Sequence, residues 1–295
     1  MAGIAATSAA ATTAAATYKR RPGLMSWLVL FPLIAWLLLF VIVPTVMLVV
    51  LSFAEQTGLG TITLTFTLEN YQRAFSWTWL KVFGTSVWYA LLTTIICVIV
   101  GYPVAFFIGR APASMRNILL TLVMIPFWTS FLIRTYSWIT ILSKEGLINS
   151  LLVSAQIIPE PITLLYTPFA SVLGLVYNYL PFMILPIYTS VERLDNAMIE
   201  AAYDLGAGPV RAFSQVILPL TAPGLTAGAL LVFVPSIAMF AITNLMGGGI
   251  PPTIGDVIYK QFTSGRAQPF GAALGTLLLL IFVVCLWGTR RQRED

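Results

Sequence analysis

Six long apolar stretches set the strongest limit on what this chain can fold into. They lie near residues 27–53, 82–109, 118–142, 169–190, 222–246 and 270–288. About 20 helical residues are enough to cross the roughly 30 Å of hydrocarbon in a bilayer. Charged residues make up only 9% of the chain, against about 25% in a typical soluble domain, which is too few to cover a globular protein of this length. The sequence therefore predicts an all-α integral membrane protein with six transmembrane helices.

The distribution of lysine and arginine predicts which way these helices face. With the N-terminus in the cytoplasm, ten basic residues fall on the cytoplasmic side and five on the outer side. Because cytoplasmic loops carry an excess of basic residues, both termini are expected inside. Residues 1–21 are expected to form a disordered cytoplasmic tail, 22–290 the membrane domain and 291–295 a cytoplasmic C-terminal tail. A signal peptide is the alternative for the N-terminus, but the first apolar run reaches about Phe53, well beyond a signal-peptide core.

Several classes of function are excluded by what the chain lacks. It has no histidine, and its two cysteines, Cys97 and Cys285, lie in separate apolar runs, so neither a metal site nor a disulfide framework is expected. No catalytic site and no directly bound cofactor are expected either. The longest loops are near 25–30 residues, too short for a nucleotide-binding domain, so energy must come from a gradient or from another subunit. The net charge of +5 is explained by cytoplasmic basic residues rather than by nucleic acid.

The most polar cytoplasmic stretch, about 192–220, has the signals of two short helices joined at a glycine. Asp195 is a plausible helix N-cap, Gly206 a left-handed helix stop and Pro209 the first turn of a second helix. Between them, one helix face is apolar at the spacing i, i+3, i+4, i+7. This face consists of Met198, Ala201, Ala202 and Leu205. The stretch is predicted to be an elbow lying along the membrane surface, the alternative being a plain connector.

The elbow resembles the EAA loop of the permease subunits of bacterial ABC importers. That loop reads Glu-Ala-Ala, three residues, Gly, nine residues, Ile, one residue, Leu-Pro. The positions that match are Glu200, Ala201, Ala202, Gly206, Leu218 and Pro219, and Val216 replaces the isoleucine. The resemblance implies the type I (MetI-like) ABC permease fold in the bacterial inner membrane, with these residues forming a coupling helix that docks on a separate ATPase.

Other segments resemble the spermidine/putrescine permeases of the PotB type. They include Phe66–Tyr71, Pro126–Ser130, Gly174–Tyr177, Leu180–Met183, Leu245–Gly249 and Ile254–Ile258. The resemblance implies a polyamine as solute and three partners: a second, PotC-like permease, a dimer of the ATPase that consumes the ATP, and a periplasmic solute-binding protein. Another small solute carried by the same mechanism remains open.

A polyamine path would use carboxylates and aromatic faces. Trp128, Tyr136 and Tyr177 are candidates, with Trp138 and Tyr179 as further rings of the same spans, and the spacing of eight residues predicts that Trp128 and Tyr136 lie on one helix face. Interfacial belt or packing positions are the alternative for these rings. Arg134 is the only ionisable residue within a predicted span. It is a candidate for a gate or for an ion pair with the partner permease, with snorkelling to the outer surface as the alternative.

Three further polar residues complete the candidate path. Asn178 and Asn244 lie inside apolar stretches, and Asp256 is a candidate acid on the outer side. The glycines and prolines of 246–252 predict an irregular segment next to Asn244. A secondary transporter without an ATPase, or a scaffold subunit, is the rival interpretation, and only the importer interpretation predicts that the elbow docks a soluble ATPase.

Overall fold

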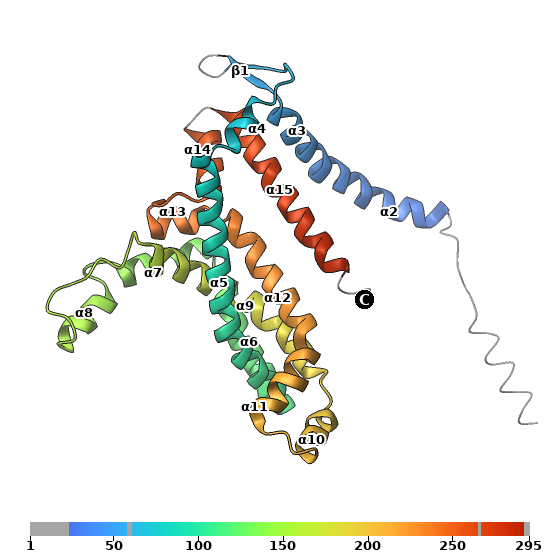
Figure 1. Cartoon of the computed structure of the whole chain (residues 1–295), viewed down its shortest axis with the longest axis vertical. Coiled ribbons are helices and arrows are strands. Elements are labelled where there is room, and N and C mark those ends of the chain that lie inside the picture. Colours follow the sequence, from blue (N-terminus) through green and yellow to red (C-terminus); the bar gives the residue numbers. More distant parts are fainter. Residues whose placement is uncertain (1–23, 58–60, 265–266, 292–295) are drawn as a thin grey trace, which may run out of the picture. The chain divides into compact units, whose positions relative to one another are not determined.

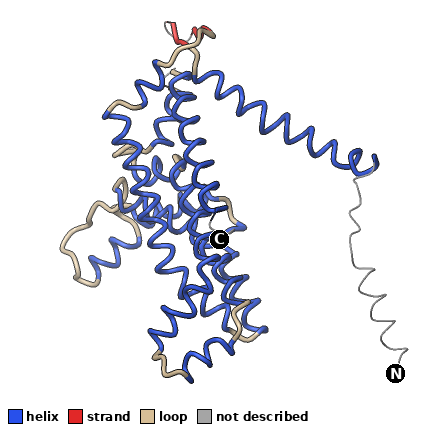
Figure 2. The backbone as a smooth tube through the Cα atoms, turned by 45° about the vertical axis from the view of Figure 1, so that its right-hand side comes forward, coloured by secondary structure: helices blue, strands red, loops and turns tan. Residues whose placement is uncertain are grey.

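The computed structural model describes residues 24–57, 61–264 and 267–291, and nearly all of them are helical (Figures 1 and 2). The one sheet in these ranges is a two-stranded antiparallel hairpin that pairs Glu55 with Thr63. The all-α prediction is confirmed apart from this hairpin. The predicted tail over 1–21 lies outside the described residues, as does the predicted C-terminal tail except for Arg291.

The chain is a succession of helices joined by short connections. The bounds in chain order are α2 Leu24–Leu37, η1 Leu38–Ile42, α3 Val43–Ser52, β1 Glu55–Thr57, β2 Thr61–Thr63, α4 Glu69–Ala74, α5 Trp77–Arg110, α6 Ala113–Met124, η2 Ile125–Trp128, α7 Phe131–Leu142, α8 Leu147–Ser154, α9 Pro168–Glu192, α10 Asn196–Asp204, α11 Pro209–Ala212, η3 Phe213–Ile217, α12 Leu218–Ala238, α13 Ala241–Gly247, α14 Ile254–Thr263 and α15 Gln268–Arg291. Of the η elements, η1 and η3 are single turns of π-helix and η2 is a 3-10 helix.

The chain divides into two compact units, one ending at Val50 and one starting at Leu51. The described part of the first unit is a run of helix through α2, η1 and most of α3. It contains most of the stretch Leu30–Ser52, which is long and apolar enough to cross a membrane and matches the predicted first span. The π-turn η1 immediately precedes Pro44, whose missing N–H interrupts the helical hydrogen-bond ladder.

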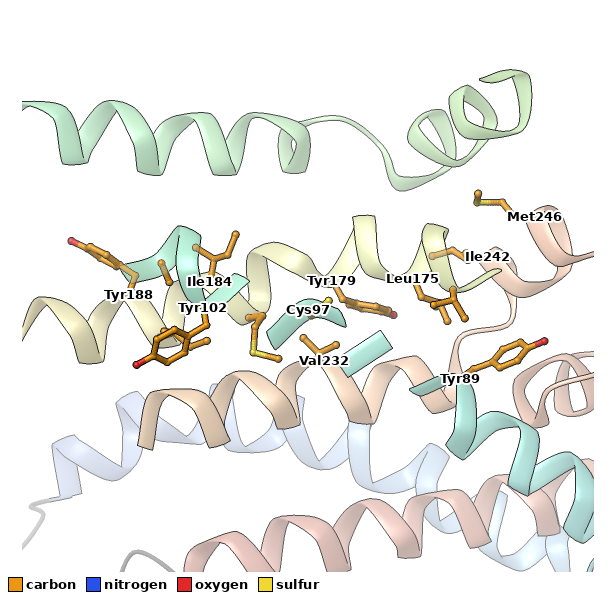
Figure 3. Close-up of a cluster of buried hydrophobic side chains, with 14 of the residues drawn as sticks. Tyr89, Cys97, Tyr102, Leu175, Tyr179, Ile184, Tyr188, Val232, Ile242 and Met246 are labelled. Atoms are coloured by element: carbon orange, nitrogen blue, oxygen red, sulfur yellow. The ribbon is translucent and has the colours of Figure 1, made fainter. Parts of the chain in front are cut away.

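In the second unit, the three long helices α5, α9 and α12 pack around one cluster of buried side chains (Figure 3). Cys97 from α5, Ile184 from α9 and Val232 from α12 are buried together in it. Gly224 on α12 lies so close to Pro186 and Ser190 of α9 that any Cβ would overlap them. Small residues at helix crossings let membrane helices approach closely. The crossing of α9 and α12 therefore requires glycine at this position.

A second buried cluster joins α14 and α15 to the first half of α5. Phe270 and Leu274 of α15 and Ile254 of α14 are almost completely buried in it. The backbone N–H of Ile254 donates a hydrogen bond of 2.7 Å to the Ser86 hydroxyl of α5. This cluster lies at the end of the unit opposite α10 and α11 (Figure 1).

The predicted third span, 118–142, is wrong as a single helix. The structure breaks it at Thr129 and Ser130, whose backbones are extended, and turns the chain by 87° between Ala113–Trp128 and Phe131–Ser154. Pro126 supplies no N–H for the helical hydrogen bonds that precede the break. After it, the Thr129 hydroxyl donates a hydrogen bond of 2.8 Å to the Pro126 carbonyl oxygen. In the described residues, five helices are long and apolar enough to cross a membrane, and this bent pair makes a sixth if it counts as one span.

The predicted fifth span, 222–246, is wrong at both ends. The helix runs without interruption from Pro209 to Ala238, and α13 is a separate short helix after the break at Met239. The Thr243 hydroxyl lies within hydrogen-bonding distance of the carbonyl oxygens of Met239 and Phe240 at this break, and the Phe240 carbonyl also accepts the first helical hydrogen bond of α13, from the N–H of Asn244. The predicted irregular segment over 246–252 is confirmed from Gly248 onward, where two successive glycines have positive φ.

Candidate functional site

The predicted elbow is present between α9 and α12. Asp195 caps α10 by accepting a hydrogen bond of 3.0 Å from the N–H of Ala197. Gly206 ends the helix with a φ of +80°, a conformation that glycine adopts without the strain of a side chain. Pro209 occupies the first turn of α11. All three local predictions for this elbow are confirmed.

The second arm of the elbow differs from its prediction. It is not a separate surface helix, because α11, η3 and α12 form one helix from Pro209 to Ala238. Leu218 and Pro219 therefore lie in the first turn of α12, and the neighbouring Ile217 is buried. The structure brings Glu200, Ala201, Ala202 and Gly206 together on the first arm and places Leu218 and Pro219 along the second.

The elbow exposes several large apolar side chains that its own chain does not cover. Of the predicted face, only Ala202 is buried, whereas Leu205 is 89% exposed. Met198, Tyr203 and Val210 are further large hydrophobic side chains that are exposed between Asp195 and Val210. Apolar side chains that gather in a polar surface segment are typical of a protein–protein contact. We call Met198, Tyr203, Leu205 and Val210 the elbow patch.

The candidate aromatic path residues do not share a helix face. Trp128 ends η2 and Tyr136 lies in α7, so the bend at Thr129 and Ser130 separates them. Both rings are exposed in this chain. Tyr177 is half-buried and packs edge-on against Trp138 of α7, with the ring centroids 5.5 Å apart. Trp138 and Tyr177 are both aromatic candidates in the sequence, and this contact joins α7 to α9.

Arg134 is buried in the first half of α7. Its side chain is only 9% exposed, and its Nε and Nη1 atoms have no hydrogen-bond partner among the described residues. The guanidinium carbon lies 5.2 Å from the centre of the Phe127 ring. A snorkelling arginine would place its guanidinium at an exposed surface of the chain, whereas that of Arg134 is buried. Burying an arginine without a paired carboxylate is costly.

The polar residues of the candidate path are mostly used inside the fold. Asn178 is buried and donates a hydrogen bond of 2.9 Å from Nδ2 to the Gly174 carbonyl oxygen, while its Oδ1 is unpartnered. Asn244 is half-buried in α13, and its backbone carbonyl oxygen accepts a hydrogen bond from the N–H of Gly248. Neither side chain is freely exposed to a solute.

Asp256 lies at the start of α14 and is fully buried. Its carboxylate accepts hydrogen bonds from the N–H of Thr253 at 3.0 Å and from the Thr253 hydroxyl at 2.7 Å, forming a capping box. The Thr243 hydroxyl of α13 lies 3.1 Å from the same carboxylate. The carboxylate thus ties α13 to α14, and a solute would reach it only by opening this cap. Thr253-x-x-Asp256 before an apolar run is a capping-box signal in the sequence, whereas nothing near Thr243 marks its contact with Asp256.

Residues 101–290 match the family described as binding-protein-dependent transport system inner membrane component. The chain belongs to this family. The spermidine/putrescine transport system permease protein PotB of Escherichia coli (strain K12) is 40% identical over 263 residues, which cover 89% of this chain and 92% of that protein. The protein of the same name from Haemophilus influenzae is 41% identical over 265 residues, covering 88% and 90%. The resemblance to PotB-type permeases is confirmed, and these relatives are transport permeases rather than enzymes.

Solved structures confirm the fold expected for this binding-protein-dependent family. A bacterial alginate ABC transporter in complex with an alginate pentasaccharide-bound periplasmic protein matches with a TM-score of 0.72 and 16% identity, over 92% of this chain and 94% of that chain. A second structure, a bacterial ABC transporter involved in the import of alginate, gives a TM-score of 0.66 and 17% identity, over 90% and 95%. The fold is that of a multi-pass ABC importer permease.

Proposed function

We propose that this chain is one permease subunit of an ATP-driven polyamine importer in the bacterial inner membrane. It forms half of the solute path, and a second, PotC-like permease forms the other half. A periplasmic binding protein delivers spermidine or putrescine, and a separate ATPase dimer consumes the ATP. This chain itself binds no cofactor and catalyses no reaction.

The observation that carries this proposal is the exposed elbow patch. Leu205 and Val210 are 89% and 80% exposed in a segment that also carries the charged residues Asp195 and Glu200. A partner protein that covers the patch would remove these apolar side chains from water. An ATPase subunit is the partner that an importer permease requires, whereas a secondary transporter has no use for such a surface.

The choice of a polyamine is supported by the relationship to PotB over about nine-tenths of both chains. The exposed rings of Trp128 and Tyr136 offer cation–π contacts, each contributing about 0.5–2 kcal/mol. Arg134 would repel a cationic solute, so we assign it to an ion pair with a carboxylate of the partner permease. Contacts of Tyr177, Asn178, Asn244 and Asp256 with the solute remain predictions.

The proposed orientation places the elbow, and with it both termini, on the cytoplasmic side. Arg110 and Arg116 lie with α10 and α11 at one end of the second unit, together with Arg193 and Arg211. The opposite end carries three basic residues, Arg73, Lys81 and Lys260, against the four at the elbow end. An excess of basic residues on the elbow side is what the positive-inside rule predicts for a cytoplasmic elbow.

The test is ATP hydrolysis and solute uptake by the complex reconstituted in liposomes with its binding protein, with and without spermidine or putrescine. Gly206→Asp is the disabling variant, because its residue must keep a positive φ. Gly208→Asp is the matched control, because Gly208 has ordinary negative φ at an N-cap position that favours aspartate, and both glycines have open space around them.

We expect polyamine to stimulate hydrolysis in the wild type and the control, and Gly206→Asp to abolish the stimulation. Stimulation by a different solute would keep the ATP-driven mechanism and reject the polyamine. Uptake by vesicles that contain no ATPase subunit would overturn the proposal.

A further inference from the structure

Two arginines connect the start of the elbow to the turn between α5 and α6, residues 109–116, which we call the corner. Arg116, in the first turn of α6, forms an ion pair with Glu192, the last residue of α9, with 2.6 Å between Nη1 and Oε1. Arg110, the last residue of α5, donates a hydrogen bond from Nη1 to Oδ1 of Asn196, the first residue of α10. The segment 192–196, which leads into the elbow, is therefore held at both ends by the same corner.

The corner itself is braced by the same side chain. The Nη2 atom of Arg116 donates hydrogen bonds to the carbonyl oxygens of Gly109 and Ala111, at 3.4 and 3.3 Å. These carbonyl groups belong to the end of α5, where helical partners run out. Arg116 thus holds the end of α5, the start of α6 and the end of α9 together.

The Val191 side chain of α9 also lies directly against the backbone of Gly109 at this corner. A Cβ on Gly109 would lie 2.6 Å from Cγ1 of Val191, the residue that precedes Glu192. Such a separation is well below van der Waals contact, so a glycine is needed for the ends of α5 and α9 to meet in this way. The polar contacts and this close approach concern the same two helix ends.

These contacts give α6 a connection to the elbow that the chain path does not provide. The elbow is covalently continuous with α9 on one side and with α12 on the other. α6 joins it only through the corner, and α6 leads to the bend at Thr129 and Ser130. Within the described ranges, the pair Arg116–Glu192 is the single ion pair.

We propose that Arg110, Arg116, Glu192 and Asn196 form a latch through which movement of the elbow is passed to α6 and to the bend that follows it. The latch rests on the proposed function, because it transmits what the ATPase does to the elbow. Its members are positioning residues, since none lies in the elbow patch or in the candidate path. They hold the corner and the elbow in one body.

The latch is accessible enough to be altered without unfolding the chain. The side chains of Arg116 and Glu192 are 25% and 39% exposed, so reversing either charge leaves no fully buried ion. Measured strengths of such partly exposed pairs correspond to an effect of about 1.4-fold to fivefold on a coupled equilibrium. We expect uptake per ATP hydrolysed to fall by about that factor in Arg116→Glu and in Glu192→Arg. The double variant, with the charges exchanged, should recover most of the loss.

A distance measurement tests the latch independently of the ATPase. Spin labels at Ser114, which is exposed on α6, and at Tyr203, which is exposed on α10, report the separation of corner and elbow. Cys97 and Cys285 are replaced by serine to leave only the two labels. Each single reversal should broaden the distance distribution and the exchange should narrow it again. Arg193→Glu is the control, because Arg193 neighbours Glu192 but is exposed and outside the latch.

A second variant avoids charge changes. Gly109→Ala should push the corner away from Val191, whereas Gly84→Ala on the same helix has open space and should change nothing. The latch would be overturned if uptake per ATP and the label distances stayed unchanged in Gly109→Ala and in both single reversals. It would also be overturned if the exchange variant recovered neither the uptake per ATP nor the wild-type label distance. If the wild-type complex takes up solute without ATP, the proposed function fails and the transmitting role fails with it. Intact ATP-driven uptake with insensitive variants rejects the latch alone.

Discussion

The hydroxyl of Tyr102 lies 2.7 Å from the hydroxyl of Thr221, joining α5 to α12 across 119 residues of sequence. Both side chains are buried, and the Thr221 hydroxyl also lies 2.8 Å from the Ile217 carbonyl oxygen. Removing the Tyr102 hydroxyl therefore leaves Thr221 with a partner. The contact lies in the first turn of α12, shortly after α11 and η3 lead from the elbow into this helix.

Tyr102→Phe should lower the free energy of unfolding by about 0.5–1.5 kcal/mol, the net contribution of one hydrogen bond whose loss strands no buried group. Unfolding of the detergent-solubilised chain by heat or denaturant measures this. Tyr203→Phe removes an exposed hydroxyl on the elbow and should have no effect. An equal loss in both variants would show that the Tyr102–Thr221 contact does not stabilise the fold.

Leu205→Ser should weaken retention of the ATPase subunit on the purified complex while leaving the unfolding midpoint unchanged. The reason is that Leu205 is 89% exposed and can contribute little to its own chain's core. Leu64→Ser provides the control, because Leu64 is 79% exposed but follows β2 at the opposite end of the unit. If Leu64→Ser released the ATPase to the same extent, the elbow patch would not be the docking surface.

Asp256→Ala should destabilise the fold by about 2–3 kcal/mol, since it removes half of a capping box and leaves the buried N–H of Thr253 without its acceptor, while the hydroxyls of Thr253 and Thr243 keep other partners. Glu160→Ala, at an exposed position, should be neutral. Unfolding and solute uptake are both measured. A variant of normal stability with a raised KM for polyamine would instead place Asp256 in the path.

Arg134→Met should have opposite effects on the isolated chain and on the assembled importer. In the isolated chain it removes a buried, unpaired charge, so stability should rise by about 1 kcal/mol or more. In the importer it removes one member of the proposed ion pair, so the partner permease should be retained less well on purification. Normal assembly combined with altered uptake would assign Arg134 to a gate rather than to the subunit contact.

The features that the sequence predicted well are those with local causes. Asp195, Gly206 and Pro209 act within one helical turn, so the elbow could be predicted from neighbouring residues alone. The bend at Thr129 and Ser130 could not be, because the apolar composition continues on both sides and hydroxyl residues are common in membrane helices. The sequence therefore suggested one continuous span where the structure has two segments.

The features that the sequence missed depend on contacts between distant segments. Arg110 and Asn196 are 86 residues apart, and nothing near either residue identifies the other. Asp256 illustrates the converse problem, because an acidic residue on the outer side was expected in the path and is used in a cap. Thr253 lies only three residues from Asp256, so the capping box itself could be predicted from the sequence.

The continuity of α11 with α12 gives one helix, Pro209–Ala238, that runs from the elbow through the core. Gly224 touches α9 near the middle of this helix, about 22 Å from Pro209 and about 21 Å from Ala238 at 1.5 Å per residue. The close contact with α9 continues at Gly228, which faces Met183. Val210 of the elbow patch and the junction of α12 with α13 therefore stand at the two ends of one helix whose middle is packed against α9.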